Sequence, residues 1–169
     1  RVDAVQAGHV IVGRALDPLA QKILLEELWL AETPFPFVTV NTIGPALIRR
    51  GTTEQKRELL ARIARGEITV AVGYTEPTAG SDLASLKTRA ERDGDHFIIN
   101  GQQIFTSGAQ SADYVWLAAR TDPNAPKRQM GISFLLIDMK TPGVSVRKIR
   151  LMDGEHEVNE VWFDNVEVP

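Results

Sequence analysis

The hydrophobic period of the chain changes near residue 68, and this change limits the folds that the chain can adopt. Before it, apolar residues recur at intervals of three and four, as in amphipathic helices. After it, short apolar stretches alternate with turn residues, as in β-strands. The order predicts an α+β protein, with an N-terminal helical segment followed by an antiparallel β-barrel or sandwich. We expect a partial helical domain over residues 1–68 and a β domain over residues 69–169.

Start signals mark the predicted helices of the first unit. Asp17 is suited to an N-cap and Pro18 to the first helical position, while Thr52 and Gln55 match a capping box. Pro45 lacks a backbone donor, so it should kink the middle helix or delay its start. So few helices do not easily close a core alone, and we expect the chain to be part of a longer one. The predicted helices cover residues 17–31, 38–50 and 52–65.

Turn signals separate the predicted strands of the second unit. Asp93-Gly94-Asp95 and Asn100-Gly101 are both hairpin signals, and Thr141-Pro142-Gly143 is a tight turn. The predicted strands cover residues 69–74, 87–92, 96–99, 103–107, 114–120, 131–138, 144–149 and 160–163.

Composition excludes several classes of function. A net charge of −3 gives no basic field for nucleic acid, and the absence of cysteine excludes disulfides and thiolate metal sites. His9, His96 and His156 are scattered without metal-ligand spacing, so we expect no metal. No apolar run approaches the roughly 20 residues that span a bilayer, and a cytoplasmic protein is the expectation.

The stretch Tyr74–Asp82 is the first candidate for a binding site. It leaves a predicted strand, breaks at Pro77 and turns at Gly80. Backbone N–H groups around Gly80 and Ser81, with hydroxyls from Thr75 and Ser81, would suit a phosphate or pyrophosphate. The stretch has neither the glycine spacing of a dinucleotide fingerprint nor a Walker lysine. An ordinary strand-to-strand loop remains the alternative.

Six motifs in one order resemble those of the acyl-CoA dehydrogenase family. The resemblance runs from about Asp17 to Pro169 and covers the later part of the family's N-terminal helical domain and essentially all of its middle β domain. The motifs are Gly51-Thr52-x-x-Gln55-Lys56 with Gly66-Glu67, Tyr74-Thr75-Glu76-Pro77-x-x-Gly80-Ser81-Asp82-Leu83, Asn100-Gly101-Gln102-Gln103-Ile104-Phe105-Thr106-Ser107-Gly108, Ala112-Asp113, Thr141-Pro142-Gly143 and Phe163-Asp164-Asn165-Val166-Glu167-Val168-Pro169.

The resemblance implies an FAD site in the loop. The family's loop that matches Tyr74–Ser81 binds the flavin ring and the pyrophosphate. By resemblance, Tyr74 belongs to this site and Thr75 bonds the pyrimidine side of the flavin. Gly80 and Ser81 would hold phosphate, and Ser81 would also lie near the bound thioester.

The resemblance also implies that Phe105, Thr106 and Ser107 lie along the flavin. Family members usually carry Trp where Phe105 stands, often followed by one residue and then Thr. Here the run looks one residue shorter, so either Thr106 or Ser107 presents its hydroxyl to flavin N5. A hydroxyl is suited to this place, because it can accept from the reduced nitrogen and donate to the oxidised one.

The reaction implied is α,β-dehydrogenation of an acyl-CoA thioester. A carboxylate removes the α proton while hydride passes from the β carbon to flavin N5, and the electrons leave to an electron-transfer flavoprotein. The family's catalytic glutamate lies in a C-terminal helical domain that would begin after Pro169. We therefore assign no catalytic role to Glu76, Asp82 or Glu155, and we expect the 169-residue piece to be inactive alone.

The resemblance gives weaker indications of substrate and assembly. Residues 33–37 and 152–159 look like the branch that acts on bulky acyl groups, such as steroid side-chain CoA thioesters. Asn41 would lie near the end of the acyl pocket, although a polar residue in a kinked core helix is the alternative. Lys127 and Arg128 either contact CoA phosphates or are solvated loop cations.

The resemblance also implies an assembly and leaves several functions open. A homo- or hetero-tetramer is expected, since the family usually assembles as dimers of dimers. The alternatives to the dehydrogenase are a non-catalytic partner subunit of a heteromeric enzyme, an acyl-CoA oxidase and a plain ligand-binding β domain.

Overall fold

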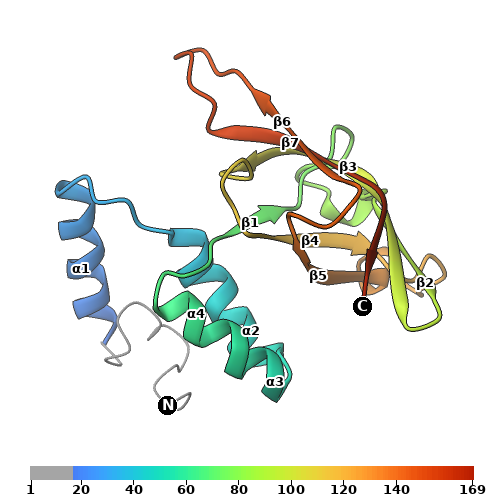
Figure 1. The fold of residues 1–169 in the computed structure, drawn as a ribbon, viewed down its shortest axis with the longest axis horizontal. Helices are drawn as coiled ribbons and strands as arrows, with labels where there is room; N and C mark the ends of the chain where they lie inside the picture. Colours follow the sequence, from blue (N-terminus) through green and yellow to red (C-terminus); the bar gives the residue numbers. More distant parts are fainter. Residues whose placement is uncertain (1–16) are drawn as a thin grey trace. The chain divides into compact units, whose positions relative to one another are not determined.

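The computed structural model describes residues 17–169 of the chain. The chain divides into two units, Arg1–Thr69 and Val70–Pro169 (Figure 1). The first is helical and the second is built on a β-sheet, which confirms the predicted α+β class. Each unit is described by itself.

The helical unit contains the three predicted helical runs. Asp17 caps the first, where its carboxylate accepts the Ala20 N–H across 2.9 Å. Thr52 and Gln55 form the predicted capping box at the start of the third. In chain order the elements are α1 (Pro18–Leu30), η2 (Thr39–Ile43), α2 (Gly44–Arg50), α3 (Thr53–Gln55), η3 (Lys56–Leu60) and α4 (Ala61–Ala64).

The middle run is not interrupted at Pro45. It begins with η2, a π-helical turn in which the Gly44 N–H donates to the Thr39 carbonyl five residues back. Pro45 then lies in the first turn of α2, where a missing N–H costs little. The predicted disturbance at proline is therefore a widened turn within a continuous helical run.

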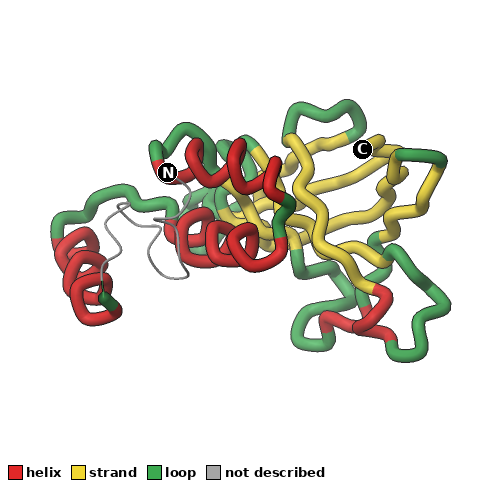
Figure 2. The backbone as a smooth tube through the Cα atoms, turned by 90° about the horizontal axis from the view of Figure 1, so that it is seen from below, coloured by secondary structure: helices red, strands yellow, loops and turns green. Residues whose placement is uncertain are grey.

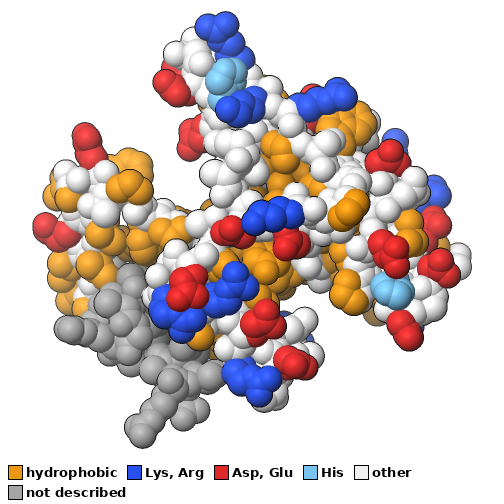
Figure 3. Space-filling view, viewed as in Figure 1, with side chains coloured by type: hydrophobic (Ala, Val, Ile, Leu, Met, Phe, Trp, Pro, Cys, Tyr) orange, Lys and Arg blue, Asp and Glu red, His pale blue; other side chains and the backbone are white. Residues whose placement is uncertain are grey.

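The helical unit buries one side of its second and third runs and exposes α1. Contacts join α2 to η3 and α4 to η2, as the paired helices in Figure 2 illustrate. Their buried residues are Val40, Ile43, Leu47, Leu59, Leu60 and Ile63. In contrast, α1 buries none of its residues, and hydrophobic side chains are visible on its surface in Figure 3.

The β unit is a seven-stranded sheet in the order β1-β4-β2-β3-β7-β6, with β5 on β4. The β2–β3, β3–β7, β4–β5 and β6–β7 pairs are antiparallel, as expected. The β1–β4 pair is parallel, so the sheet is mixed. The strands are β1 (Val70–Gly73), β2 (Arg89–Asp93), β3 (His96–Ser107), β4 (Tyr114–Arg120), β5 (Ile132–Asp138), β6 (Val144–Ile149) and β7 (Val158–Val168).

The hairpin predicted at Asn100-Gly101 is wrong. Strand β3 continues through it, whereas the predicted hairpin at residues 93–95 does join β2 to β3. Opposite Asn100, β7 carries an extra residue at Asn165, whose φ is 49°. Asn100 fixes this bulge by accepting the Asn165 N–H and donating to its side-chain oxygen. The strand predicted over residues 160–163 is therefore part of a longer, bulged strand.

Two apolar clusters hold the sheet. The larger takes residues from six strands and includes Val115, Leu117, Ile137, Val161 and Phe163. The smaller lies where the β1–β2 connection packs on β4, and it centres on Ala79, Leu86 and Ala118. The second cluster matters for the site, because it fixes the connection that contains the predicted binding loop.

Candidate functional site

The loop after β1 is anchored on both sides of an exposed segment. A tight turn closes it, in which Glu76 and Ala79 exchange backbone hydrogen bonds of 2.8 and 3.2 Å. Ala79 and Leu86 are each 2% exposed, while the residues from Gly80 to Asp82 are exposed. The segment that the sequence singled out is therefore held at its two ends by buried side chains.

The backbone of this segment is open to a ligand. Within residues 17–169, no protein group accepts from the N–H of Gly80 or of Ser81. A Cβ added at Gly80 would meet no atom within 4 Å, so the space beside it is free. Exposed N–H groups at a glycine are the donors that an anionic group such as pyrophosphate requires.

The Glu76 side chain fixes the loop through hydrogen bonds with backbone N–H groups. Its carboxylate is 6% exposed and accepts the N–H groups of Lys87 and Thr88 across 2.7 and 2.6 Å. Thr88 in turn accepts a hydrogen bond of 3.0 Å from the buried Gln103 side chain of β3. Because both carboxylate oxygens accept hydrogen bonds, Glu76 has a structural role in this loop.

The loop and strand β3 meet at one hydrogen bond. The Ile104 N–H donates to the Thr75 carbonyl across 2.7 Å. It is free to do so because β3 bulges there: Gln103 pairs with Val161 and Thr106 with Asn159, so Ile104 and Phe105 stand opposite one residue of β7. The structure thus brings the loop that begins at Tyr74 beside the strand that carries Phe105–Ser107.

The bulge decides which side chains of this strand are exposed. Gln103 and Thr106 are 0% and 1% exposed although they are three residues apart, whereas Phe105 is 59% exposed and Ser107 is also exposed. One inserted residue reverses the alternation that follows it. Phe105 bears the strain, since its φ of 58° is left-handed and costs a non-glycine residue about 1–2 kcal/mol. Of the two candidate hydroxyls, Ser107 is therefore accessible and Thr106 is in the core.

Tyr74 lies in an aromatic cluster. Its ring centroid is 5.4 Å from that of Phe134, which is stacked on Trp116 at 5.9 Å. Burial raises the pKa of the Tyr74 hydroxyl above its ordinary value, and a hydrogen bond with Trp116 offsets this in part. The hydroxyl is therefore neutral at physiological pH.

Arg120, which the sequence did not mark as a site residue, links the loop after β1 to the loop that carries Lys127 and Arg128. Its guanidinium donates to the carbonyls of Ala84 and Arg128 across 2.7 and 2.9 Å. These bonds lie between η4 (Leu83–Ser85) and η5 (Arg128–Gly131), which contact each other. Nothing in the local sequence distinguishes Arg120 from an exposed strand-end cation.

The two predicted substrate cations lie near this junction. Arg128 approaches Asp82 with a nitrogen–oxygen distance of 4.0 Å, and both side chains are exposed. Lys127 is exposed and precedes η5.

Asn41 belongs to the other unit, in η2, where its Nδ2 is buried and finds no partner within residues 17–169.

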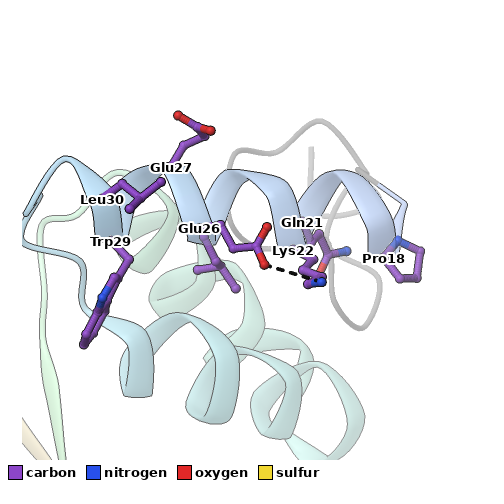
Figure 4. Close-up of a pocket in the computed structure, with 8 residues that line it drawn as sticks. Pro18, Gln21, Lys22, Glu26, Glu27, Trp29 and Leu30 are labelled. Carbon is purple, nitrogen blue, oxygen red and sulfur yellow. Dashed lines mark ion pairs between the residues drawn. The ribbon is translucent and has the colours of Figure 1, made fainter.

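A separate groove runs along α1 (Figure 4). Its rim carries the ion pair Lys22–Glu26 at 3.4 Å, and its apolar part includes the exposed Trp29 and Leu30. It contains none of the residues that the sequence predicted for cofactor or substrate.

Within residues 17–169, no three or more side chains of the metal-binding types come together. Within the same residues, every helix is too short or too polar to cross a bilayer.

Comparison with known proteins identifies the family. Residues 71–166 match the acyl-CoA dehydrogenase middle domain, and residues 9–67 match the acyl-CoA dehydrogenase N-terminal domain. The chain belongs to the acyl-CoA dehydrogenase family. Members of this family are oxidoreductases and generally depend on FAD.

Individual acyl-CoA dehydrogenases are similar over nearly all of the chain. FadE29 of Mycobacterium tuberculosis is 51% identical over 157 residues, which are 93% of this chain and 40% of that protein. Cyclohex-1-ene-1-carbonyl-CoA dehydrogenase of Geobacter metallireducens is 38% identical over 163 residues, 93% of this chain and 42% of that protein. The chain thus spans about two fifths of the length of these acyl-CoA dehydrogenases.

Solved acyl-CoA dehydrogenase structures have the same fold. The Tcur3481-Tcur3483 steroid acyl-CoA dehydrogenase, as its G363A variant, superimposes with a TM-score of 0.89 at 49% identity, over 93% of this chain and 41% of that one. The ChsE4-ChsE5 complex from Mycobacterium tuberculosis gives 0.88 at 38% identity, over 99% and 45%.

Proposed function

We propose that this chain is the part of an FAD-dependent acyl-CoA dehydrogenase that holds the flavin. The observation that carries the proposal is the hydrogen bond between Ile104 and Thr75, because it joins the open Gly80–Ser81 segment to the exposed Phe105–Ser107 face. A cofactor with a flat ring and a diphosphate needs both an exposed apolar edge and free backbone donors.

The residues of the β unit fit this cofactor. The N–H groups of Gly80 and Ser81, which no group in the described part of the chain accepts, are suited to the pyrophosphate, and Thr75 provides a hydroxyl where the loop leaves β1. Tyr74 would contribute through its backbone, since its ring is packed against Phe134. Phe105 offers an exposed aromatic side chain for the edge of the flavin ring.

We propose Ser107, in preference to Thr106, as the hydroxyl that meets flavin N5. Ser107 is exposed beside Phe105, whereas Thr106 is buried on the other face of β3. A hydroxyl can donate to an unprotonated nitrogen and accept from a protonated one, so a serine serves both redox states.

The chemistry proposed is α,β-dehydrogenation of an acyl-CoA thioester. FAD, when bound, supplies the acceptor for the hydride from the β carbon. This chain contributes position: Ser81 is exposed to contact the thioester, and Glu76 holds the loop by accepting two N–H groups. We propose that the base that removes the α proton is not among these 169 residues.

The proposed substrates are bulky acyl-CoA thioesters of the steroid side-chain type. The similarity to a structure described as a steroid acyl-CoA dehydrogenase supports this class. Asn41, whose amide nitrogen finds no partner within residues 17–169, is the proposed contact to the acyl group, and Lys127 and Arg128 are the proposed contacts to CoA phosphates. Electron-transfer flavoprotein is the proposed acceptor, and a cytoplasmic tetramer the proposed setting.

A non-catalytic partner subunit is the second candidate. The similarity to complexes of two different chains, Tcur3481-Tcur3483 and ChsE4-ChsE5, favours it. Such a subunit would keep the fold but lack the base or the flavin.

Spectroscopy and turnover of the complete protein test the proposal. We expect a yellow protein with bound FAD that oxidises steroid side-chain CoA thioesters with electron-transfer flavoprotein as acceptor. A colourless protein active only beside a second chain would support the partner subunit. Stoichiometric peroxide would instead indicate an oxidase. The absence of bound flavin, both in the protein alone and in its complex with a second chain, would overturn the proposal.

A further inference from the structure

The bulged register of β3 requires a stabilising interaction, and the side chain of Asn159 is positioned to provide it. Phe105 is in a left-handed conformation that a side chain rarely adopts, so the strand would gain by slipping back to regular pairing. Slipping by one residue would turn Thr106 outward and Ser107 inward. Something must therefore favour the bulged register over the regular one.

Asn159 lies directly opposite Thr106 and is completely buried. Its Nδ2 donates to the Thr106 carbonyl across 3.0 Å and also to the side-chain oxygen of Gln110. The Thr106 carbonyl is within reach because Thr106 stands opposite Asn159 in this register. A buried donor that loses its acceptor is penalised, so the side chain selects this register.

The surroundings of Asn159 point to positioning more than to stability. The Oδ1 of Asn159, the Oγ1 of Thr106 and the Oε1 of Gln103 are buried, and no group within residues 17–169 bonds to them. An apolar set of side chains would fill this part of the core without those unmade hydrogen bonds. The polar cluster is a poor way to stabilise a core but a specific way to fix one strand register.

We propose that Asn159 is a positioning residue that keeps Phe105 and Ser107 on the exposed face of β3. The inference rests on the proposed function, since those two side chains matter as the edge of the flavin site. Asn159 touches neither flavin nor substrate in this scheme, and it acts through the Thr106 carbonyl.

The first test compares Asn159→Asp with Val161→Ala in the complete protein. Asp has the size of Asn but no amide donor, so no cavity is created. Val161 is equally buried on the same strand, and its truncation is a control for general destabilisation. When the two variants have lost the same amount of Tm, we expect N159D, but not V161A, to speed amide exchange of residues 104–108 at least tenfold. We also expect it to weaken FAD binding about tenfold, measured by the recovery of free-flavin fluorescence.

The second test removes the strain. Phe105→Gly relieves the left-handed backbone, so Asn159→Leu should speed exchange of residues 104–108 much less in the Phe105→Gly background than alone. This readout needs no flavin and stays informative if N159D folds poorly. Equal effects of N159L in both backgrounds, or equal exchange in N159D and V161A, would overturn the inference. Failure of the wild-type protein to bind FAD would contradict the proposed function and leave the exchange test to decide on Asn159.

Discussion

The Ile104 N–H donates to the carbonyl of Thr75 across 2.7 Å, and this bond joins two segments that are separated in the sequence by β2 and the first part of β3. It exists because the bulge in β3 frees the Ile104 N–H from the β7 ladder. This bond joins the open loop directly to the backbone of the strand whose face is exposed. Substitutions on either side of it therefore have different expected effects on folding and on binding.

Gly101→Ala should destabilise the β unit. A Cβ at this position would overlap the Thr88 hydroxyl oxygen, which Gln103 holds by a hydrogen bond. Overpacking of this kind costs about 1–3 kcal/mol, and we expect a loss of that size in urea unfolding. An unchanged midpoint would show that Thr88 moves aside freely.

Gly80→Ala should separate binding from stability. No atom lies within 4 Å of the added Cβ and the backbone is not left-handed, so the change in stability should stay within about 0.5 kcal/mol. The methyl group would occupy the space proposed for the pyrophosphate, and we expect FAD affinity to fall by about tenfold, or 1.4 kcal/mol. Titration of the apo-protein with FAD measures it, and unaltered affinity would argue against this loop as the phosphate site.

Ser107→Ala and Thr106→Val should have opposite signatures. Loss of the exposed Ser107 hydroxyl should alter the flavin absorbance and weaken FAD binding by about 1 kcal/mol, with little change in Tm. The buried Thr106 hydroxyl has no partner within residues 17–169, so Val should leave the flavin spectrum unchanged and preserve or raise the Tm. The reverse pattern would assign the flavin contact to Thr106.

Glu76→Gln should weaken the loop without removing a base. The carboxylate accepts two N–H groups, and an amide replaces one acceptor oxygen by a donor that faces the Lys87 or Thr88 N–H. We expect a cost of about 1–3 kcal/mol in thermal or urea unfolding. Glu91→Gln is the control, because Glu91 is exposed and its pairing with Arg89 at 3.7 Å contributes little. Equal effects at the two positions would contradict the structural role.

Arg120→Met should loosen the connection between the two loops. Its hydrogen bonds to the Ala84 and Arg128 carbonyls would be lost, and we expect faster amide exchange in η4 and η5 with a stability loss of about 1–3 kcal/mol. Arg128→Ala keeps its carbonyl and loses only a 4.0 Å exposed ion pair, so it should cost less than about 1 kcal/mol. Comparable amide exchange of η4 and η5 in both variants would show that the Arg120 side chain does not hold the two loops together.

Local signals account for most of the fold that the sequence predicts. The N-cap at Asp17, the capping box of Thr52 and Gln55 and the change of period near residue 68 each depend on neighbours within a few positions. They gave the α+β class and the helix starts. The loop at Gly80 was recognised for the same reason, because its turn residues are consecutive.

Cross-strand partners decided the rest. The Asn100-Gly101 pair has the composition of a hairpin, yet Asn165, 65 residues away, makes it part of a continuous strand. Likewise, Thr106 and Ser107 are adjacent and chemically alike, and Asn159, 53 residues from Thr106, pairs with Thr106 beside the bulge that buries one and exposes the other. Strand register is a property of two chain segments together, so the residues of one segment could not reveal which hydroxyl faces outward.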